Sequence, residues 1–274
     1  MYLPIQSQQT CVQAWLAAVT AVHNMNGHEA YNVIIDIENP LQRTEGDEQV
    51  IELLDSFLRS HDEHPVATVI NTIFPYKLFL QHGTPEIYDS FLRVYDRIKK
   101  PGDWGRYFHR MIFHETAGGE VINPLANLVE KVRRQAQGNR TFRSVYELSV
   151  FDPVIDLQIY DAAKAAGRVM NRQCLSFLSF KLHPAKGLML TAMYRNHYYI
   201  ARGLGNLIGL GRLQEFIASQ ASVPVGPLTC ISTHAQVDRD PWNKRELDRL
   251  LHACAEALEN SDGITVTPAS VGHP

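Results

Sequence analysis

The chain has 274 residues, of which 45% are hydrophobic and 20% charged, so it is long enough to bury a large globular core. The formal net charge is -3 and Lys and Arg are scattered along the chain, so the sequence lacks the clustered basic residues of a protein that binds nucleic acid polymers. The four cysteines form no C-x-x-C pair, and the sequence shows no basic leader. No apolar run approaches the roughly 18 residues of a membrane span. These features predict a cytoplasmic protein without a membrane partner.

The first half of the chain predicts mainly helices. Each has a helical stripe of apolar residues or a run of helix formers, and Gly, Asn or Pro punctuates the ends. One early β-branched segment, "YNVIIDIENP", predicts a strand from Tyr31 to Glu38. Helices are predicted at 12–22 and 47–60, and two more lie between 64 and 100, separated by "QHGTPEIYD". The stretch "PGDWGRYFHRM" predicts a loop that leads into a helix, and "NPLANLVEKVRRQAQGN" predicts a further helix.

The second half predicts a sheet. A strand at "FRSVYELSVFDP" precedes two more, Gln173 to Leu182 and Gly187 to Ile200, joined by "HPAKG". A helix from about Asn206 to Ala221, a strand at "GPLTCIST" and a final helix at "KRELDRLLHACAEALE" complete the pattern. Because no repeat, low-complexity tract or linker interrupts the chain, we expect one α+β domain over residues 1–274.

Cys174 heads the run "NRQCLSFLSFKL" and is either a nucleophile at the start of a strand or a small core residue. Downstream, "YRNHYYIARGLGNLIGLGRL" supplies Arg195, Asn196, His197, Arg202 and Asn206 beside glycines that let backbone approach a ligand. The glycine spacing fits neither a dinucleotide fingerprint nor a P-loop, so a purely structural turn is the alternative. His109 and His114 lack the spacing of a helical zinc motif, and no metal site is predicted.

The order of these motifs resembles the thymidylate synthase and deoxycytidylate (CMP) hydroxymethylase superfamily, of which the chain is identified as a divergent member. In that family a nucleophilic Cys opens a strand, an "RS-x-D-x-x-x-G-x-P-x-N" segment follows, and a His ends a later strand. Here these are "QC" at Cys174, "RNHYYIARGLGN" from Arg195 to Asn206, and "STHAQ" with His234. Upstream, "WGRYFHRM" from Trp104 and "GNRTFRSVYELSV" look like two further family segments.

The resemblance implies a thymidylate synthase-like fold, with a mixed β-sheet, helices packed on one face and the sheet face used for dimerisation. It implies a homodimer that binds a pyrimidine nucleoside monophosphate and transfers a one-carbon unit from 5,10-methylenetetrahydrofolate to C5. The implied roles are nucleophile for Cys174, phosphate binding for Arg195 and for Arg140 or Arg143 from a partner subunit, base recognition for Asn206, and sugar contact for His234. Asn196, Gly205 and Trp104 complete the implied nucleotide site.

Several positions depart from the family. Asn71 stands where the family has a Glu that organises proton transfer, and Tyr198 stands where it has Asp. The stretch after the last helix predicts a shortened or missing folate-closing segment. Arg195 and Arg202 are expected to lower the pKa of the Cys174 thiol. Two alternatives stay open: a nucleotide-binding protein that has lost folate-dependent catalysis, and a Cys-dependent enzyme that cleaves the glycosidic bond.

Overall fold

A computed structural model describes residues 2–99, 106–116, 118–138, 142–152, 156, 173–237 and 240–261. Its main feature is a seven-stranded mixed sheet in the order β1-β2-β9-β7-β6-β5, with β8 paired to β9. Strand pairs β1–β2, β7–β9 and β8–β9 are parallel, and β2–β9, β6–β7 and β5–β6 are antiparallel. The strands are β1 Leu3–Pro4, β2 Glu29–Ile37, β5 Glu147–Ser149, β6 Leu175–His183, β7 Gly187–Tyr194, β8 His197–Tyr198 and β9 Val225–Gln236; β3 His114–Glu115 and β4 Val121–Ile122 form a separate pair.

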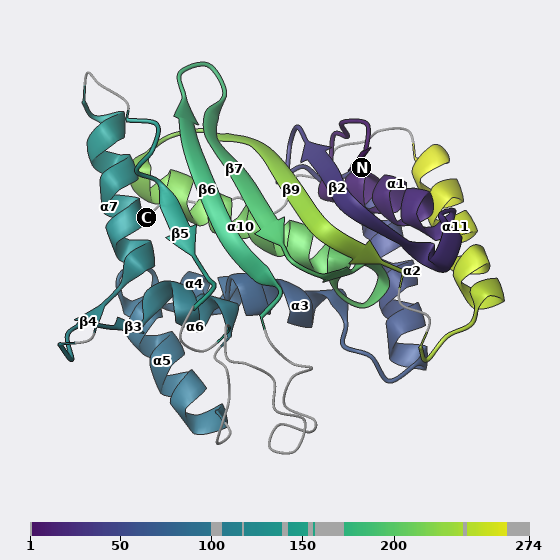
Figure 1. Cartoon of the computed structure of the whole chain (residues 1–274), viewed down its shortest axis with the longest axis horizontal. Helices are drawn as coiled ribbons and strands as arrows, with labels where there is room; N and C mark the ends of the chain where they lie inside the picture. Colours follow the sequence, from purple (N-terminus) through teal and green to yellow (C-terminus); the bar gives the residue numbers. More distant parts are fainter. Residues whose placement is uncertain are drawn as a thin grey trace.

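Helices cover one face of this sheet (Figure 1). Helices α1 (Cys11–His23) and α10 (Leu204–Ala221) pack directly on the strands, α3 and α7 pack against α10, and α2 and α11 pack beside α1. The predicted α+β class, with a mixed sheet and helices on one face, is confirmed. The remaining helices of the described residues are α2 Glu45–Ser60, α3 Val66–Ile73, α4 Tyr76–His82, α5 Glu86–Ile98, α6 Tyr107–Ile112, α7 Pro124–Ala136 and α11 Lys244–Glu259, with short turns η1 Asn26–His28 and η3 Tyr199–Gly203.

Side-chain caps explain where several helices begin. The Thr44 hydroxyl accepts from the Asp47 backbone N–H while the Asp47 carboxylate accepts from the Thr44 N–H, which forms a capping box for α2. Asn243 and Glu246 form the same arrangement at α11. The Thr10 hydroxyl caps α1 and also donates to Asp47 at 3.0 Å, so it joins the starts of two helices.

Three predicted elements differ from the structure. The first of the two helical stretches predicted between residues 64 and 100 is divided into α3 and α4, because Pro75 has no N–H to continue the helical hydrogen bonds. The strand predicted to reach Ile200 ends at Tyr194, and residues Tyr199–Gly203 form a π-helical turn before α10. The strand predicted at 142–153 is reduced to Glu147–Ser149 in the described residues.

Candidate active site

The register of the sheet brings the predicted residues to one end of it. Leu175 at the start of β6 pairs with Tyr194 at the end of β7, and Tyr194 pairs with Ser232 of β9. Cys174 and Arg195 therefore lie next to each other, and the Arg195 backbone N–H donates to the Cys174 carbonyl at 2.9 Å. Neighbouring strands thus assemble a candidate site from segments far apart in the sequence.

The Cys174 thiol is partly buried beside the Arg195 side chain. Burial raises its pKa, and the charge and hydrogen bond of Arg195 act in the opposite direction without reversing the shift. The expected lowering of this pKa by two arginines is therefore wrong in its net direction. Arg202 instead forms an ion pair with Glu63, at 3.4 Å between guanidinium and carboxylate.

Tyr107, the first residue of α6, holds the backbone at Cys174 through hydrogen bonds. Its hydroxyl oxygen accepts from the backbone N–H of Cys174 at 3.2 Å and of Leu175 at 3.4 Å. Burial raises the pKa of Tyr107 to about 12, so the phenol stays protonated at neutral pH. Tyr107 is not among the residues predicted from the sequence, although it lies within the "WGRYFHRM" segment quoted for Trp104.

Asn206 lies in the first turn of α10 with only 5% of its surface exposed. Its Nδ2 donates to Nε2 of His197 at 3.1 Å, and Nδ1 of His197 lies 3.0 Å from the Ser232 hydroxyl. The Tyr199 hydroxyl donates to the same Ser232 oxygen at 3.3 Å. Burial lowers the pKa of His197 to about 3, so its ring is neutral at physiological pH. Ser232 and Tyr199 were not predicted, and His197 was named in the glycine-bearing segment without a role, because nothing in the spacing of the three residues indicates that they meet.

His234 lies near the end of β9, where β9 pairs with the start of β2. Its Nδ1 is 2.6 Å from Oδ1 of Asn196, and its Nε2 is 3.1 Å from a carboxylate oxygen of Glu29. The ring also packs against Tyr31, directly opposite in the register, at a centroid distance of 5.1 Å. Asn196 and His234, both predicted as nucleotide-binding, are thus in direct contact.

Comparison with known proteins supports the predicted resemblance. A curated protein of Methanocaldococcus jannaschii named "Putative thymidylate synthase" is 29% identical over 135 residues, which cover 48% of this chain and 56% of that protein. The chain resembles a thymidylate synthase. The matched part of the chain spans about half the length of the Methanocaldococcus jannaschii protein. No family model matches the chain. The thermostable thymidylate synthase A of Bacillus subtilis aligns over 82% of this chain and 70% of its own, with 14% identity and a TM-score of 0.43.

Two other residues assigned through the thymidylate synthase resemblance make contacts of a structural kind. Asn71 is exposed on α3, and its Nδ2 donates to the Ala67 carbonyl of the same helix at 2.9 Å. Gly205 faces α3 so closely that a Cβ there would lie 2.5 Å from Cβ of Val69 and 3.0 Å from the Val66 carbonyl oxygen. The close approach at Gly205 is therefore to a packed helix. A direct contact of either residue with a nucleotide stays a prediction.

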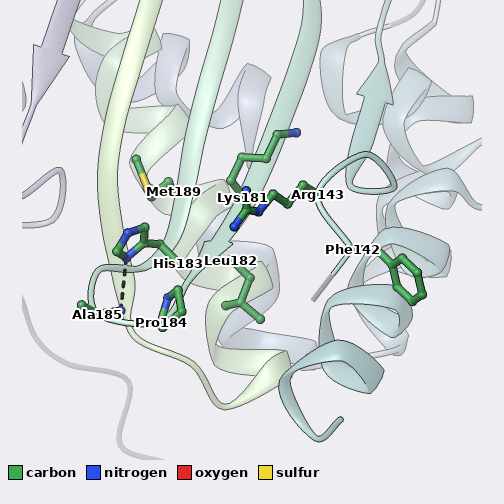
Figure 2. A pocket seen from close by; sticks show the side chains of 8 residues that line it. All are labelled: Phe142, Arg143, Lys181, Leu182, His183, Pro184, Ala185 and Met189. Carbon is green, nitrogen blue, oxygen red and sulfur yellow. Dashed lines mark hydrogen bonds between the residues drawn. The ribbon is translucent and has the colours of Figure 1, made fainter. Parts of the chain in front are cut away.

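Arg143 lies away from the site within this chain. It lines a pocket of about 560 Å³ at the turn between β6 and β7, together with Lys181 and His183 (Figure 2). Cys174 precedes the other end of β6, roughly 25 Å away at about 3.3 Å per residue. Arg140 and Trp104 lie outside the described residues.

Two properties of the described residues complete the picture. No group of three or more His, Cys, Asp or Glu side chains in these ranges is placed to hold a metal ion. No helix in them is long and apolar enough to cross a membrane.

Proposed function

We propose that this chain is a divergent enzyme of the thymidylate synthase type that binds a pyrimidine nucleoside 5′-monophosphate and activates its C5 for one-carbon transfer. The observation that carries the proposal is the meeting of a partly buried thiol, an arginine and a buried amide at one end of the sheet. Cys174 would be the nucleophile, Arg195 would bind the phosphate and Asn206 would contact the base. His234, held by Asn196, would contact the sugar.

The chemistry follows from these groups. The Cys174 sulfur adds as a thiolate to C6 of the pyrimidine, an S–C6 bond forms, and the C5–C6 π electrons move to C5 and the carbonyl at C4. C5 can then take up a proton or another electrophile. Loss of the original C5 proton, followed by breaking of the S–C6 bond, restores the ring and releases the thiolate. The Arg195 charge favours the thiolate needed for the first step and works against the burial that raises the thiol pKa.

The one-carbon donor implied by the resemblance, 5,10-methylenetetrahydrofolate, would supply the carbon that becomes attached to C5. Where the family has an Asp that helps to fix the pyrimidine pocket, this chain has Tyr198, which is 37% exposed and carries no carboxylate. The segment expected to close over the donor lies outside the described residues, and we derive no step through the donor.

Release of tritium from C5 of a labelled nucleotide tests the proposal, because exchange requires the C6 adduct. We expect slow exchange with the wild-type protein and none with Cys174→Ser. Cys254→Ala is a matched control, since Cys254 is buried in α11 and takes no part in the site. Full exchange by Cys174→Ser would refute covalent catalysis.

A nucleotide-binding protein without the reaction is a second candidate, and the raised pKa of Cys174 favours it. Such a protein would bind a nucleotide, with a rise in melting temperature, but would show no exchange at C5. Glycosidic cleavage through the same adduct would instead release free base, which chromatography detects.

The proposed homodimer would use the sheet face that the helices of the described residues leave open (Figure 1). Phe177 and Met193 pair across β6 and β7 and are 36% and 38% exposed. Sedimentation of the wild-type protein and of a Phe177→Asp, Met193→Asp double variant tests this, with a shift to monomer expected for the variant. All four cysteines are free thiols, in keeping with the proposed cytoplasmic location.

A further inference from the structure

Strand pairing at the end of β9 gathers a row of polar side chains beside His234. Gln236 lies directly opposite Glu29 of β2 on one side and directly opposite Tyr198 of β8 on the other. Side chains directly opposite each other in a sheet share a face, so Glu29, Gln236 and Tyr198 form one row across three strands. The neighbouring row contains His234 and Tyr31, which also pair directly.

Consecutive contacts connect Glu29 to the candidate active site. The Arg195 backbone N–H donates to the Cys174 carbonyl, and the next residue, Asn196, has its Oδ1 2.6 Å from Nδ1 of His234. Nε2 of His234 lies 3.1 Å from Oε2 of Glu29. Because β9 and β7 separate β2 from β6, the backbones at Glu29 and Cys174 are about 14 Å apart, at about 4.8 Å per strand. A nucleoside monophosphate can bridge this span between the side chains at its two ends.

The Glu29 carboxylate has hydrogen-bonding capacity left for a ligand, whereas the His234 ring has none. Both ring nitrogens of His234 are engaged, Nδ1 with Asn196 and Nε2 with Glu29. Glu29 uses only Oε2 for this contact, and no hydrogen bond from another described residue reaches its Oε1. A carboxylate accepts about four hydrogen bonds and donates none. The Glu29 side chain is 43% exposed, so a ligand hydroxyl can reach it.

We propose that Glu29 is a specificity-determining residue that selects ribonucleotides over deoxyribonucleotides by accepting hydrogen bonds from the 2′- and 3′-hydroxyls of the sugar. The inference rests on the proposed function, in which the sugar lies against His234. Ribose carries both hydroxyls on one face of its ring, and the two oxygens of one carboxylate can accept from both of them. Deoxyribose has no 2′-hydroxyl. A site built to bind a hydroxyl disfavours the analogue that lacks it, because a polar group of the site then loses its partner.

The contact with His234 prepares Glu29 for this role. A carboxylate only accepts, so Nε2 of His234 carries the hydrogen that points at Glu29. This bond restricts the rotamers of the Glu29 side chain before a ligand arrives, which lowers the entropy cost of binding. Because the carboxylate is partly exposed, water can replace part of a lost hydrogen bond, and we expect a preference of about tenfold for ribose.

Calorimetric dissociation constants for two pairs, UMP with dUMP and CMP with dCMP, test the selection. The ratio within a pair cancels the contribution of the base, so the test does not depend on which base the protein prefers. We expect the ribonucleotide of the better-bound pair to bind about tenfold more tightly than its deoxy counterpart. Arabinosyl UMP, whose 2′-hydroxyl lies on the opposite face of the ring, should bind no more tightly than dUMP. Equal or tighter binding of the deoxyribonucleotides would overturn the proposal.

Glu29→Gln tests the carboxylate itself, because it keeps the length of the side chain and removes its charge and one acceptor oxygen. We expect the ribose-to-deoxyribose ratio to fall close to one, mainly through weaker binding of the ribonucleotide. Glu38→Gln is a matched control, since Glu38 follows the other end of β2, about 30 Å away at about 3.3 Å per residue. A role of Glu29 in stability alone would weaken both sugars together. A ratio left unchanged by Glu29→Gln would overturn the proposal.

Failure of this inference and failure of the proposed function give different results. If none of the four nucleotides binds the wild-type protein, the proposed function fails and sugar selection fails with it. If nucleotides bind without a preference for ribose, nucleotide binding stands and the role of Glu29 alone is refuted. Thermal unfolding of Glu29→Gln and Glu38→Gln without ligand shows whether each variant is folded at the temperature of the titration, and the measurements on the wild-type protein decide the proposal if a variant is not.

Discussion

Replacing Gly205 by Ala tests whether this glycine serves packing or ligand binding. The added Cβ would lie 2.5 Å from Cβ of Val69 and 3.0 Å from the backbone oxygen of Val66. Neither atom can rotate away, so α10 and α3 must separate, at a cost of about 1–3 kcal/mol for overpacking. Alanine regains up to about 1 kcal/mol of helix propensity. We expect a net loss of about 1–2 kcal/mol in the free energy of unfolding.

Urea and thermal unfolding of Gly205→Ala measure this loss. At about 2–4 °C per kcal/mol for a chain of this size, the melting temperature should fall by about 2–8 °C. Gly118→Ala is a matched control, because the nearest atom to its Cβ would be 3.9 Å away. In the Gly205→Ala, Val69→Gly double variant the two effects should not add, since removing the Val69 Cβ relieves the clash. A Gly205→Ala protein of undiminished stability that no longer binds nucleotide would refute the packing argument.

Three further predictions follow from the charged and titratable groups. Asp156→Asn should destabilise the protein by about 3–5 kcal/mol, because it leaves Arg110 buried without its carboxylate partner, now at 2.6 Å. Burial raises the pKa of Asp156, but the opposing effects of Arg110 and other neighbours are larger and hold this pKa below its ordinary value of 3.8. The Asp156 carboxylate therefore stabilises the folded protein above pH 3.8, and this stabilisation is lost as the pH falls further. Arg195→Gln should raise the pKa of Cys174 further and slow its alkylation by iodoacetamide at pH 7.5. The pKa of His197 is about 3 in the folded protein against 6.5 in the unfolded chain. The free energy of unfolding should therefore fall as the pH drops from about 6.5 toward 3, and it should fall less in the His197→Phe variant.

Controls separate these predictions from general damage. Arg202→Gln removes a cation that pairs with Glu63, and it should leave the alkylation rate of Cys174 unchanged. Equal slowing by both arginine variants would contradict the specific effect of Arg195. An Asp156→Asn protein as stable as the wild type at pH 7 would show that the buried ion pair contributes nothing. Parallel acid profiles for wild type and His197→Phe would contradict the titration of His197.

Local patterns predicted much of the fold. The helical stripe and acidic first turn at residues 47–60 correspond to α2, and the β-branched run near Tyr31 corresponds to β2. These predictions succeed because the periodicity of apolar residues reflects which face is buried. The division at Pro75 was missed although a proline is itself a local helix-breaking signal, and the π-helical turn before α10 was missed because Tyr199 and Ile200 were assigned to the preceding strand.

For the candidate site, the sequence by itself determined the residue types and their order: a cysteine before a strand, an arginine after the next, an amide opening a helix and a histidine late in a further strand. Only the tertiary structure decided how these groups are tuned. Burial raises the pKa of Cys174, Tyr107 supports its backbone, and His197 anchors Asn206. The physical reason is that pKa values and hydrogen-bond directions depend on neighbours that strand register and helix packing bring together. These neighbours can be far apart in the sequence, by 67 residues for Tyr107 and Cys174 and by 205 for Glu29 and His234, and no local pattern records such contacts.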